Sequence, residues 1–319
     1  MGSVIFNFYN DDRDIWLSSF CKYFKLNKKK VLFYLKNANS NILSPNLLVS
    51  DLGLNLNNYN SNTVEIVCRH FTTTLDDTAK SFHTFGLLDL KSVLQSENSL
   101  SHFLEEHGIK VNVDDRLLII NSKPYYISLH GEPCTQCFES REKQCGENSR
   151  CSLRKSIDNL GLKLYYYEAT LEFFIHASFD EMMRYSTISR HPEILYTLDT
   201  VLDKLSNGLK YDLSYDWVKK HKKCFILEFS AKLSDMETFA PISYKTAYND
   251  IYVCIEQSGY DYDDYIDKVI PQTILDNFTL IRWFISVYFN NIKVLGSLLP
   301  NKIVEPEKIK VIEVEDLCL

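Results

Sequence analysis

Four cysteines within eighteen residues constrain this chain more than any other feature of its sequence. Cys134, Cys137, Cys145 and Cys151 have the spacing C-x2-C-x7-C-x5-C. Four thiolates this close suit a tetrahedral zinc ion, because the two-residue gap lets one tight turn present two sulfur atoms and the second pair completes the coordination sphere. The residues between them are mostly polar, so without a metal the segment could bury little apolar surface. We expect a zinc-binding insert over residues 130–156 with a structural role, since four thiolates leave no open coordination position.

Two other interpretations of the cysteines remain open: free loop thiols or two disulfides, and a site in which His130 replaces one thiolate. The chain has nine cysteines, an odd count that leaves one unpaired in a disulfide framework. Four cysteines on a metal and five buried thiols in a reducing cytoplasm explain this count better. The N-terminus also lacks the basic segment and apolar stretch of a secretory signal. We therefore expect a cytoplasmic protein.

Length and composition predict a globular protein of one large or two medium domains. The chain has 319 residues, of which 45% are hydrophobic and 24% charged, and its net charge is -7. This charge argues against coating duplex nucleic acid by bulk charge, although a local basic groove remains possible. The apolar stretch at residues 280–289 is shorter than the roughly 20 residues that cross a bilayer. We expect no membrane span.

Hydrophobic periodicity predicts an α+β fold with a mixed sheet, several helices and the small four-cysteine zinc insert. Strands are expected at residues 4–8, 64–68, 117–121, 124–129, 162–167, 224–231 and 309–315. Among the expected helices, one starts near Ile15 and others cover residues 170–185 and 274–289. Because an Asn/Ser-rich region runs from 37 to 62, we expect an N-terminal α/β segment at 1–62 and a main α+β domain at 63–319.

One expected helix carries polar residues at intervals of four. Glu168, Glu172, His176 and Asp180 would line one face of a helix over 170–185 and the residues before it. A metal site usually gathers ligands from more than one element, so we interpret them as a solvated polar face. The chain lacks the motifs of P-loop hydrolases, Rossmann dehydrogenases, zincins and α/β-hydrolases.

The strand at 64–68 ends in Arg69-His70-Phe71-Thr72-Thr73. A histidine at a strand end with hydroxyl groups beside it can direct its ring into a cleft and bond a ribose. Gly86-Leu87-Leu88 follows this strand, and Glu313-Val314-Glu315 lies near the end of the chain. Together these segments resemble the ADP-ribosyltransferase superfamily, particularly its RNA 2′-phosphotransferase-like and DNA-modifying toxin branches.

The resemblance implies an enzyme that binds NAD and transfers ADP-ribose to a nucleic acid or a protein. It implies that His70 and Thr72 orient the nicotinamide ribose and that Tyr125 or Tyr126 stacks on the nicotinamide. Arg69 could hold the pyrophosphate, because a guanidinium matches phosphate geometry.

The catalytic carboxylate implied by the resemblance is Glu313 or Glu315. Departure of neutral nicotinamide leaves positive charge on the ribose, and a fixed carboxylate in a dry site stabilises that charge. His70 could instead be a core histidine and Glu315 a surface residue.

The alternative function is a non-catalytic binding module, possibly in a host-defence or toxin system. In it the zinc insert would recognise RNA, DNA or a protein through its basic rim of Arg141, Lys143, Arg150, Arg154 and Lys155.

Overall fold

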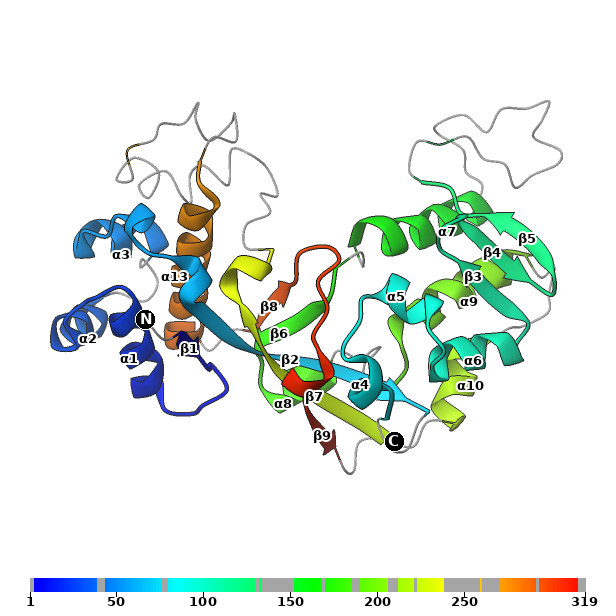
Figure 1. The fold of residues 1–319 in the computed structure, drawn as a ribbon, viewed down its shortest axis with the longest axis horizontal. Helices are drawn as coiled ribbons and strands as arrows, with labels where there is room; N and C mark the ends of the chain where they lie inside the picture. Colours follow the sequence, from blue (N-terminus) through cyan, green and yellow to red (C-terminus); the bar gives the residue numbers. More distant parts are fainter. Residues whose placement is uncertain are drawn as a thin grey trace. The chain divides into compact units, whose positions relative to one another are not determined.

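Helices and sheets are mixed in the chain, as the α+β prediction requires. The computed structural model describes residues 3–38, 44–75, 80–129, 132, 152–167, 170–184, 190–205, 212–220, 223–237, 259, 270–290 and 293–314. The chain divides into two compact units, each made of three segments (Figure 1). Unit 1 comprises Met1–Arg69, Glu172–Phe179 and Glu228–Leu299, and unit 2 comprises His70–Leu171, Asp180–Leu227 and Pro300–Leu319. The boundary expected at residue 62 stays a prediction.

Unit 1 combines a sheet with N-terminal helices and one long helix. Its helices are α1 (Arg13–Tyr23), α2 (Lys28–Asn37), α3 (Pro45–Leu52) and α13 (Gln272–Asn290), with short 3-10 helices at Leu56–Asn58, Ser61–Thr63 and Leu233–Asp235. Its strands are β1 (Val4–Phe6), β6 (Glu172–His176), β8 (Val294–Ser297) and parts of β2 (Val64–Thr74) and β7 (Lys223–Lys232). The strand order is β8-β6-β2-β7, with β1 parallel to β2. β6 is antiparallel to both of its neighbours.

A buried amide fixes α13 in unit 1. Asn277 is fully buried, donates hydrogen bonds to the carbonyl oxygens of Leu56 (2.8 Å) and Tyr59 (2.9 Å), and accepts one from the Tyr23 hydroxyl (2.6 Å). Phe284 of the same helix stacks on Phe20 of α1 with ring centroids 4.2 Å apart. A buried amide stays inside only when its polar atoms are bonded. These contacts therefore fix the position of α13 against α1 and against the 3-10 turn at Leu56–Asn58.

Unit 2 contains most of the remaining helices and a second sheet. Its helices are α4 (Lys80–Phe85), α5 (Leu90–Gln95), α6 (Ser99–Glu106), α7 (Ser152–Leu162), α9 (Glu193–Leu205) and α10 (Leu213–Lys220), with a π-helical turn at Lys163–Tyr167 and a 3-10 turn at Pro306–Lys308. α8 (Phe179–Arg184) begins at the last residue of a unit 1 segment. The strands β3 (Ile109–Asn112), β4 (Leu117–Ile120) and β5 (Lys123–Tyr126) form an antiparallel sheet. β9 (Lys310–Val314) pairs with β7 in the other sheet.

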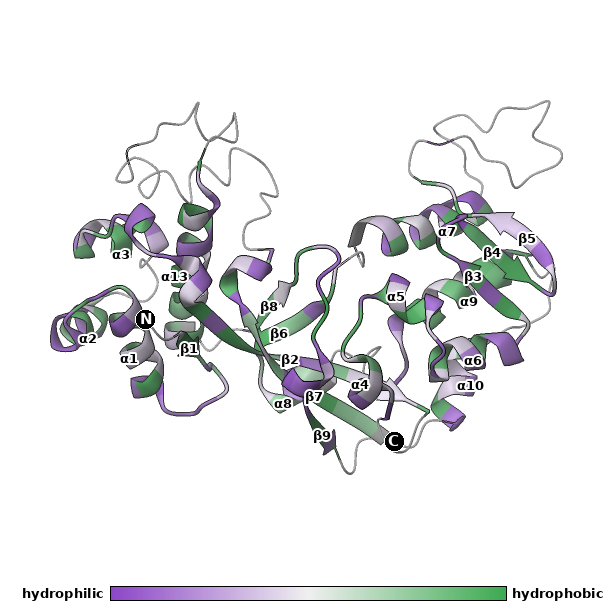
Figure 2. Cartoon of the chain, viewed as in Figure 1, coloured by the Kyte–Doolittle hydropathy of each residue, from purple (hydrophilic) through white to green (hydrophobic). Residues whose placement is uncertain are grey.

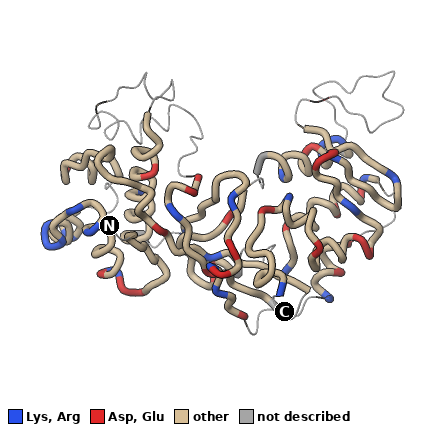
Figure 3. The backbone as a smooth tube through the Cα atoms, viewed as in Figure 1, with Lys and Arg blue, Asp and Glu red and all other residues tan. Residues whose placement is uncertain are grey.

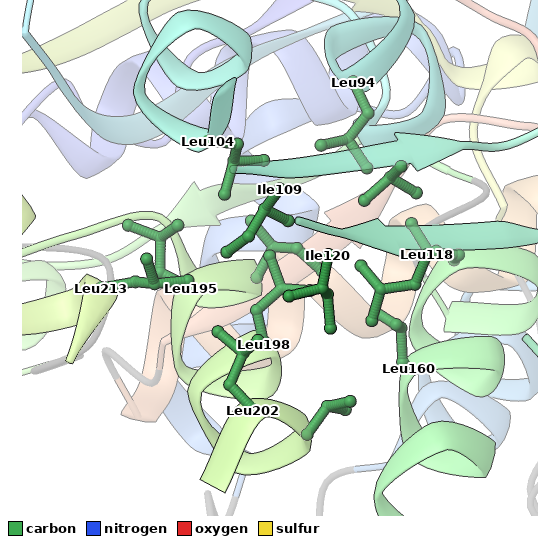
Figure 4. Close-up of a cluster of buried hydrophobic side chains, with 14 of the residues drawn as sticks. Leu94, Leu104, Ile109, Leu118, Ile120, Leu160, Leu195, Leu198, Leu202 and Leu213 are labelled. Atoms are coloured by element: carbon green, nitrogen blue, oxygen red, sulfur yellow. The ribbon is translucent and has the colours of Figure 1, made fainter. Parts of the chain in front are cut away.

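Aliphatic side chains from this small sheet and the neighbouring helices form the core of unit 2. Figure 4 shows Ile109 and Ile120 of the sheet beside Leu160 of α7 and Leu198 of α9, and all four are buried. In Figure 2, β4 and β7 are green along most of their length, as expected for buried strands. The β4–β5 hairpin turns at Asn121 and Ser122, whose φ angles of 47° and 67° are those of a type I′ turn. The strands predicted at 117–121 and 124–129 left residues 122–123 for the turn, so the turn lies one residue earlier than predicted.

Two secondary-structure predictions are wrong. Residues 162–167 continue α7 as a π-helical turn instead of forming a strand. The segment predicted as one helix over 170–185 contains strand β6 and then α8. Glu172 and His176 therefore lie on a strand and Asp180 on α8, so these three residues do not share a helical face. Glu168 lies outside the described residues. Pairing with β2 and β8 overrides the local helical pattern, because the run Phe173 to Ile175 is buried between these strands.

Among the helices that the structure describes, none has the length and apolar character needed to cross a membrane.

Candidate functional site

Strand β2 positions the histidine and threonine that the sequence singles out. Side chains alternate between the two faces of a strand, so His70 and Thr72 share a face, and both are half-buried. Thr73 and Thr74 are buried: the Thr73 hydroxyl accepts a hydrogen bond from the Trp217 indole (3.1 Å), and Thr74 bonds the Ser99 hydroxyl (2.8 Å). The Thr72 hydroxyl makes only a long contact of 3.5 Å with the Thr73 carbonyl. Of the three consecutive threonines, Thr72 is therefore the one best able to bond a ligand.

After β2, helix α4 leads into the segment Gly86-Leu87-Leu88. Helix α4 ends at Phe85, and the φ of 77° at the next residue, Gly86, lies in the left-handed region. A Cβ at this position would clash with the Val304 carbonyl oxygen. Leu87 and Val304 exchange two backbone hydrogen bonds of 2.9 and 3.0 Å. Only glycine therefore suits this close approach, which fixes the segment after α4 against the chain just before β9.

Arg69 lies on the opposite face of β2 from His70 and has strong partners there. Its Nε and Nη2 atoms donate hydrogen bonds of 2.8 and 2.7 Å to one carboxylate oxygen of Glu228. Its guanidinium carbon lies 4.0 Å from the ring centroid of Tyr9, whose hydroxyl donates to the Phe174 carbonyl (2.8 Å). Burial raises the pKa of Tyr9 far above its usual range, so its hydroxyl stays protonated. Glu228 thus uses two of the five N–H donors of Arg69, and a pyrophosphate would either share the guanidinium with Glu228 or displace it.

This Tyr9–Arg69–Glu228 cluster is a feature that the sequence interpretation missed. Glu228 interrupts the otherwise apolar run of β7, with buried Leu227 before it and buried Phe229 after it. A carboxylate within a buried strand needs a charged partner, because an isolated buried charge is strongly unfavourable. That signal predicts a basic partner for Glu228 but does not say which residue provides it.

The two tyrosines implied to stack on nicotinamide belong to a different sheet from β2. Tyr125 and Tyr126 lie on β5, the edge strand of the three-stranded sheet. The Tyr126 hydroxyl accepts a hydrogen bond from Arg116 (3.2 Å), which also pairs with Glu132 at 2.8 Å. The Lys123 ammonium lies 5.2 Å from the Tyr125 ring centroid. The structure thus gives both tyrosines local partners within the small sheet.

Glu313 is an exposed residue of β9. Strand β7 lies between β9 and β2 in the sheet order, so the strands that carry Glu313 and His70 are about 10 Å apart at the usual strand spacing. Glu315 lies outside the described residues. A small ligand would be needed to connect a carboxylate on β9 with the histidine on β2.

Cys134, Cys137, Cys145 and Cys151 all lie outside the residues that the structure describes. Within the described ranges, no cluster of three or more His, Cys, Asp or Glu side chains could hold a metal ion. Cys21, Cys68 and Cys224 are buried cysteines. Burial raises the pKa of Cys21 to about 11 and the pKa of Cys68 well above its ordinary value. Cys21 and Cys68 are therefore unreactive core thiols.

A hollow of about 440 Å³ lies in unit 2 between α5, α6 and β3. Leu94, Leu104 and Val111 give it apolar walls, and Ser101 and His102 are among its polar groups. Its size is within the range of small-molecule sites. None of the residues implied by the resemblance lines it.

No family model, curated protein or solved structure matches this chain.

Proposed function

We propose that the protein is an ADP-ribosyltransferase-like enzyme that transfers ADP-ribose from NAD to a nucleic acid or protein acceptor. The observation that carries the proposal is the geometry of β2: His70 and Thr72 share one half-buried face, while the neighbouring threonines are occupied in the core. The order of strand, α4 and left-handed Gly86 supports the same assignment.

In this reaction the bond between ribose C1′ and the nicotinamide nitrogen breaks, and its electron pair leaves with nicotinamide. A nucleophilic oxygen or nitrogen of the acceptor then forms the new bond to C1′ and releases its proton. His70 and Thr72 would hold the ribose hydroxyls, and Glu313 or Glu315 would stabilise the positive charge that develops on the ribose. Tyr125 or Tyr126 would stack on nicotinamide, which requires the ligand to connect the two sheets.

The pyrophosphate contact assigned to Arg69 has a structural cost. A pyrophosphate that drew the guanidinium away from Glu228 would break two charge-assisted hydrogen bonds and expose a carboxylate that is now half-buried. A role in fixing β2 against β7 through Glu228 agrees better with these contacts.

The proposal includes a structural zinc ion held by Cys134, Cys137, Cys145 and Cys151, in a protein of the reducing cytoplasm. The buried free thiols of Cys21 and Cys68 support a reducing compartment. Zinc measured by mass spectrometry should approach one ion per chain and fall when any of the four cysteines is changed to serine.

The test of the catalytic proposal is nicotinamide release from NAD by the full chain, with and without mixed cellular nucleic acid and protein as acceptors. His70→Ala, Thr72→Val and Glu315→Gln should each lower release at least tenfold. The exposed residues His102 and Glu307 provide the matched controls His102→Ala and Glu307→Gln, which should leave it unchanged. Glu313→Gln identifies which of the two glutamates acts.

Unchanged release and NAD binding in His70→Ala would overturn the enzyme assignment. Salt-sensitive nucleic-acid binding lost on charge reversal of Arg141 and Lys143, without any NAD turnover, would favour the zinc-stapled binding module instead.

A further inference from the structure

Basic residues gather in the N-terminal helices of unit 1, although the whole chain is acidic. No Asp or Glu occurs between Asp14 and Asp51, whereas six lysines do: Lys22, Lys25, Lys28, Lys29, Lys30 and Lys36. The chain as a whole has a net charge of -7, so this positively charged stretch has the opposite sign to the chain. Figure 3 shows blue along much of α2. The first half of unit 1 thus carries a local positive surface.

Among the described residues, one acidic side chain pairs with one of these six lysines. Lys28 pairs with Asp14 at 2.5 Å, and the nearest acidic residue beyond α2, Asp51, accepts a hydrogen bond from the Tyr34 hydroxyl (2.8 Å). Within the described parts of the chain, the remaining lysines form no ion pair: Lys22, Lys25, Lys29, Lys30 and Lys36. Their charges therefore remain available to a partner.

The position of three lysines in α2 is unfavourable for the helix itself. Lys28, Lys29 and Lys30 form its first turn, which contains no acidic residue, and the only cap is the Asn27 side chain bonded to the Lys30 amide. The N-terminal end of a helix carries partial positive charge, so cations there are destabilising. Helix stability therefore does not account for these residues.

An exposed aromatic ring lies among the lysines. Phe33 is 72% exposed. On a helix, Lys29, Lys30 and Lys36 lie three or four residues from it and share its face. The apolar side chains Val31 and Leu35 point the other way and are buried in unit 1. The outer face of α2 thus combines a flat apolar ring with ammonium groups on both sides along the helix.

We propose that this outer face of α2, together with the exposed Lys22 and Lys25 of the chain just before it, binds single-stranded nucleic acid. The lysines neutralise phosphates, and Phe33 stacks on an unpaired base, which is how proteins bind single strands without sequence preference. An anionic membrane fits less well, because an interfacial helix needs a broad apolar face and α2 has already buried its own in the core. The inference is independent of the NAD site.

The experiment measures binding of fluorescein-labelled dT20 and U20 to the full chain by anisotropy over a range of salt concentrations. If all five lysines contact phosphates, the slope of log K against log salt should be about -3.5 for a single strand. The double variant Lys29→Gln/Lys30→Gln should make this slope shallower by about 1.4. Phe33→Ala should weaken binding at least about fivefold at fixed salt.

Matched controls come from unit 2. The exposed Lys110 and Lys308 give the double variant Lys110→Gln/Lys308→Gln, and Tyr196, 65% exposed, gives Tyr196→Ala. These controls should leave affinity and slope unchanged. Thermal melting separates binding from folding, because Lys29→Gln/Lys30→Gln should retain or raise the melting temperature while it weakens binding.

Two outcomes overturn the proposal. One is oligonucleotide binding that is absent or that the α2 variants leave unchanged. The other is preferential binding to vesicles with 30 mol% phosphatidylserine over phosphatidylcholine vesicles and oligonucleotides, lost in the same variants, which would identify a membrane partner instead.

Discussion

Helices α2 and α10 use lysine in opposite ways. In α10 the acidic Asp216 lies in the first turn and Lys219 and Lys220 lie in the last. This order matches the helix dipole, and Lys220 also pairs with Glu106 at 2.6 Å. In α2 three lysines occupy the first turn. The charges of α10 therefore stabilise that helix, whereas the three lysines at the start of α2 destabilise theirs through the helix dipole.

The first turns of α10 and α2 also differ in how their free backbone amides are bonded. Asp199 of α9 accepts hydrogen bonds from the backbone amides of Leu213 (2.7 Å) and Ser214 (3.0 Å) and from the Ser214 hydroxyl (2.6 Å). A carboxylate thus satisfies the free amides at the start of α10. The start of α2 has the neutral Asn27 alone. The start of α10 is thus stabilised by a carboxylate, whereas the start of α2 carries positive charge that a partner can bind.

The largest expected effect comes from the core anchor of α10. Trp217 is almost completely buried, lies 5.1 Å from Phe103 between ring centroids, and donates a hydrogen bond to Thr73. Trp217→Ala should lower the free energy of unfolding by about 3–5 kcal/mol, because it leaves a large cavity. Urea unfolding followed by circular dichroism measures this loss. Tyr215→Ala, on the exposed side of the same helix, should change stability by less than about 0.5 kcal/mol.

Helix α2 should depend on its apolar anchor almost as strongly. Leu35 is buried, so Leu35→Ala should cost about 2–5 kcal/mol in the same urea assay. Phe33→Ala on the outer face should be nearly neutral. A large stability loss for Phe33→Ala would show that this ring supports the fold and would remove the contrast between the two faces of α2.

The carboxylate at the start of α10 predicts a pH-dependent effect. Burial raises the pKa of Asp199, and the hydrogen bonds from Ser214 and Leu213 oppose this shift only in part. A raised pKa means that the folded state binds the proton more tightly, so this contribution to stability is present at low pH and lost as pH rises through the folded pKa. Asp199→Asn should abolish this dependence, and its stability relative to the native chain should improve from pH 3.5 to 7.

An alanine at position 199 removes the hydrogen-bond acceptor as well as the charge, so a comparison with asparagine separates the two contributions to stability. Asp199→Ala leaves the amides of Leu213 and Ser214 without this partner and should cost about 1–2 kcal/mol at pH 3.5, a loss typical of a missing helix cap. This cost should shrink as pH rises, because alanine, like asparagine, does not titrate. Urea midpoints of the alanine and asparagine variants give the difference directly. Equal midpoints would mean that the hydrogen bonds contribute little.

The sequence predicts the elements whose pattern is local. The strand at 64–68, the hairpin of residues 117–129, the helix at 274–289 and the last strand at 309–315 all occur, with shifted ends. β6 was missed because its strand character depends on pairing with β2 and β8, and Phe174 meets Arg69 across more than 100 residues of sequence. Local spacing instead suggested a helix.

The same limit applies to side-chain partners. The sequence singles out Arg69 and His70, and strand alternation alone places them on opposite faces. The partner of Arg69, however, is Glu228, 159 residues away. The lysine run of α2 is visible in the sequence, but its exposure beside Phe33 depends on which helix face the core takes.

The smallest expected effect is a change in stability of opposite sign when lysines are removed from α2 and from α10. Lys29→Gln/Lys30→Gln removes cations from a helix N-terminus and should raise stability by a few tenths of a kcal/mol, about 0.3 for each charge at low salt. Lys219→Gln/Lys220→Gln removes cations from a helix C-terminus, together with the pair to Glu106, and should lower the melting temperature. Differential scanning calorimetry at 20 mM and 500 mM salt measures both, and both shifts should shrink at high salt because exposed charges are screened. Shifts of the same sign would mean that the dipole does not distinguish the two helices, and the lysines of α2 would then need no partner to explain their position.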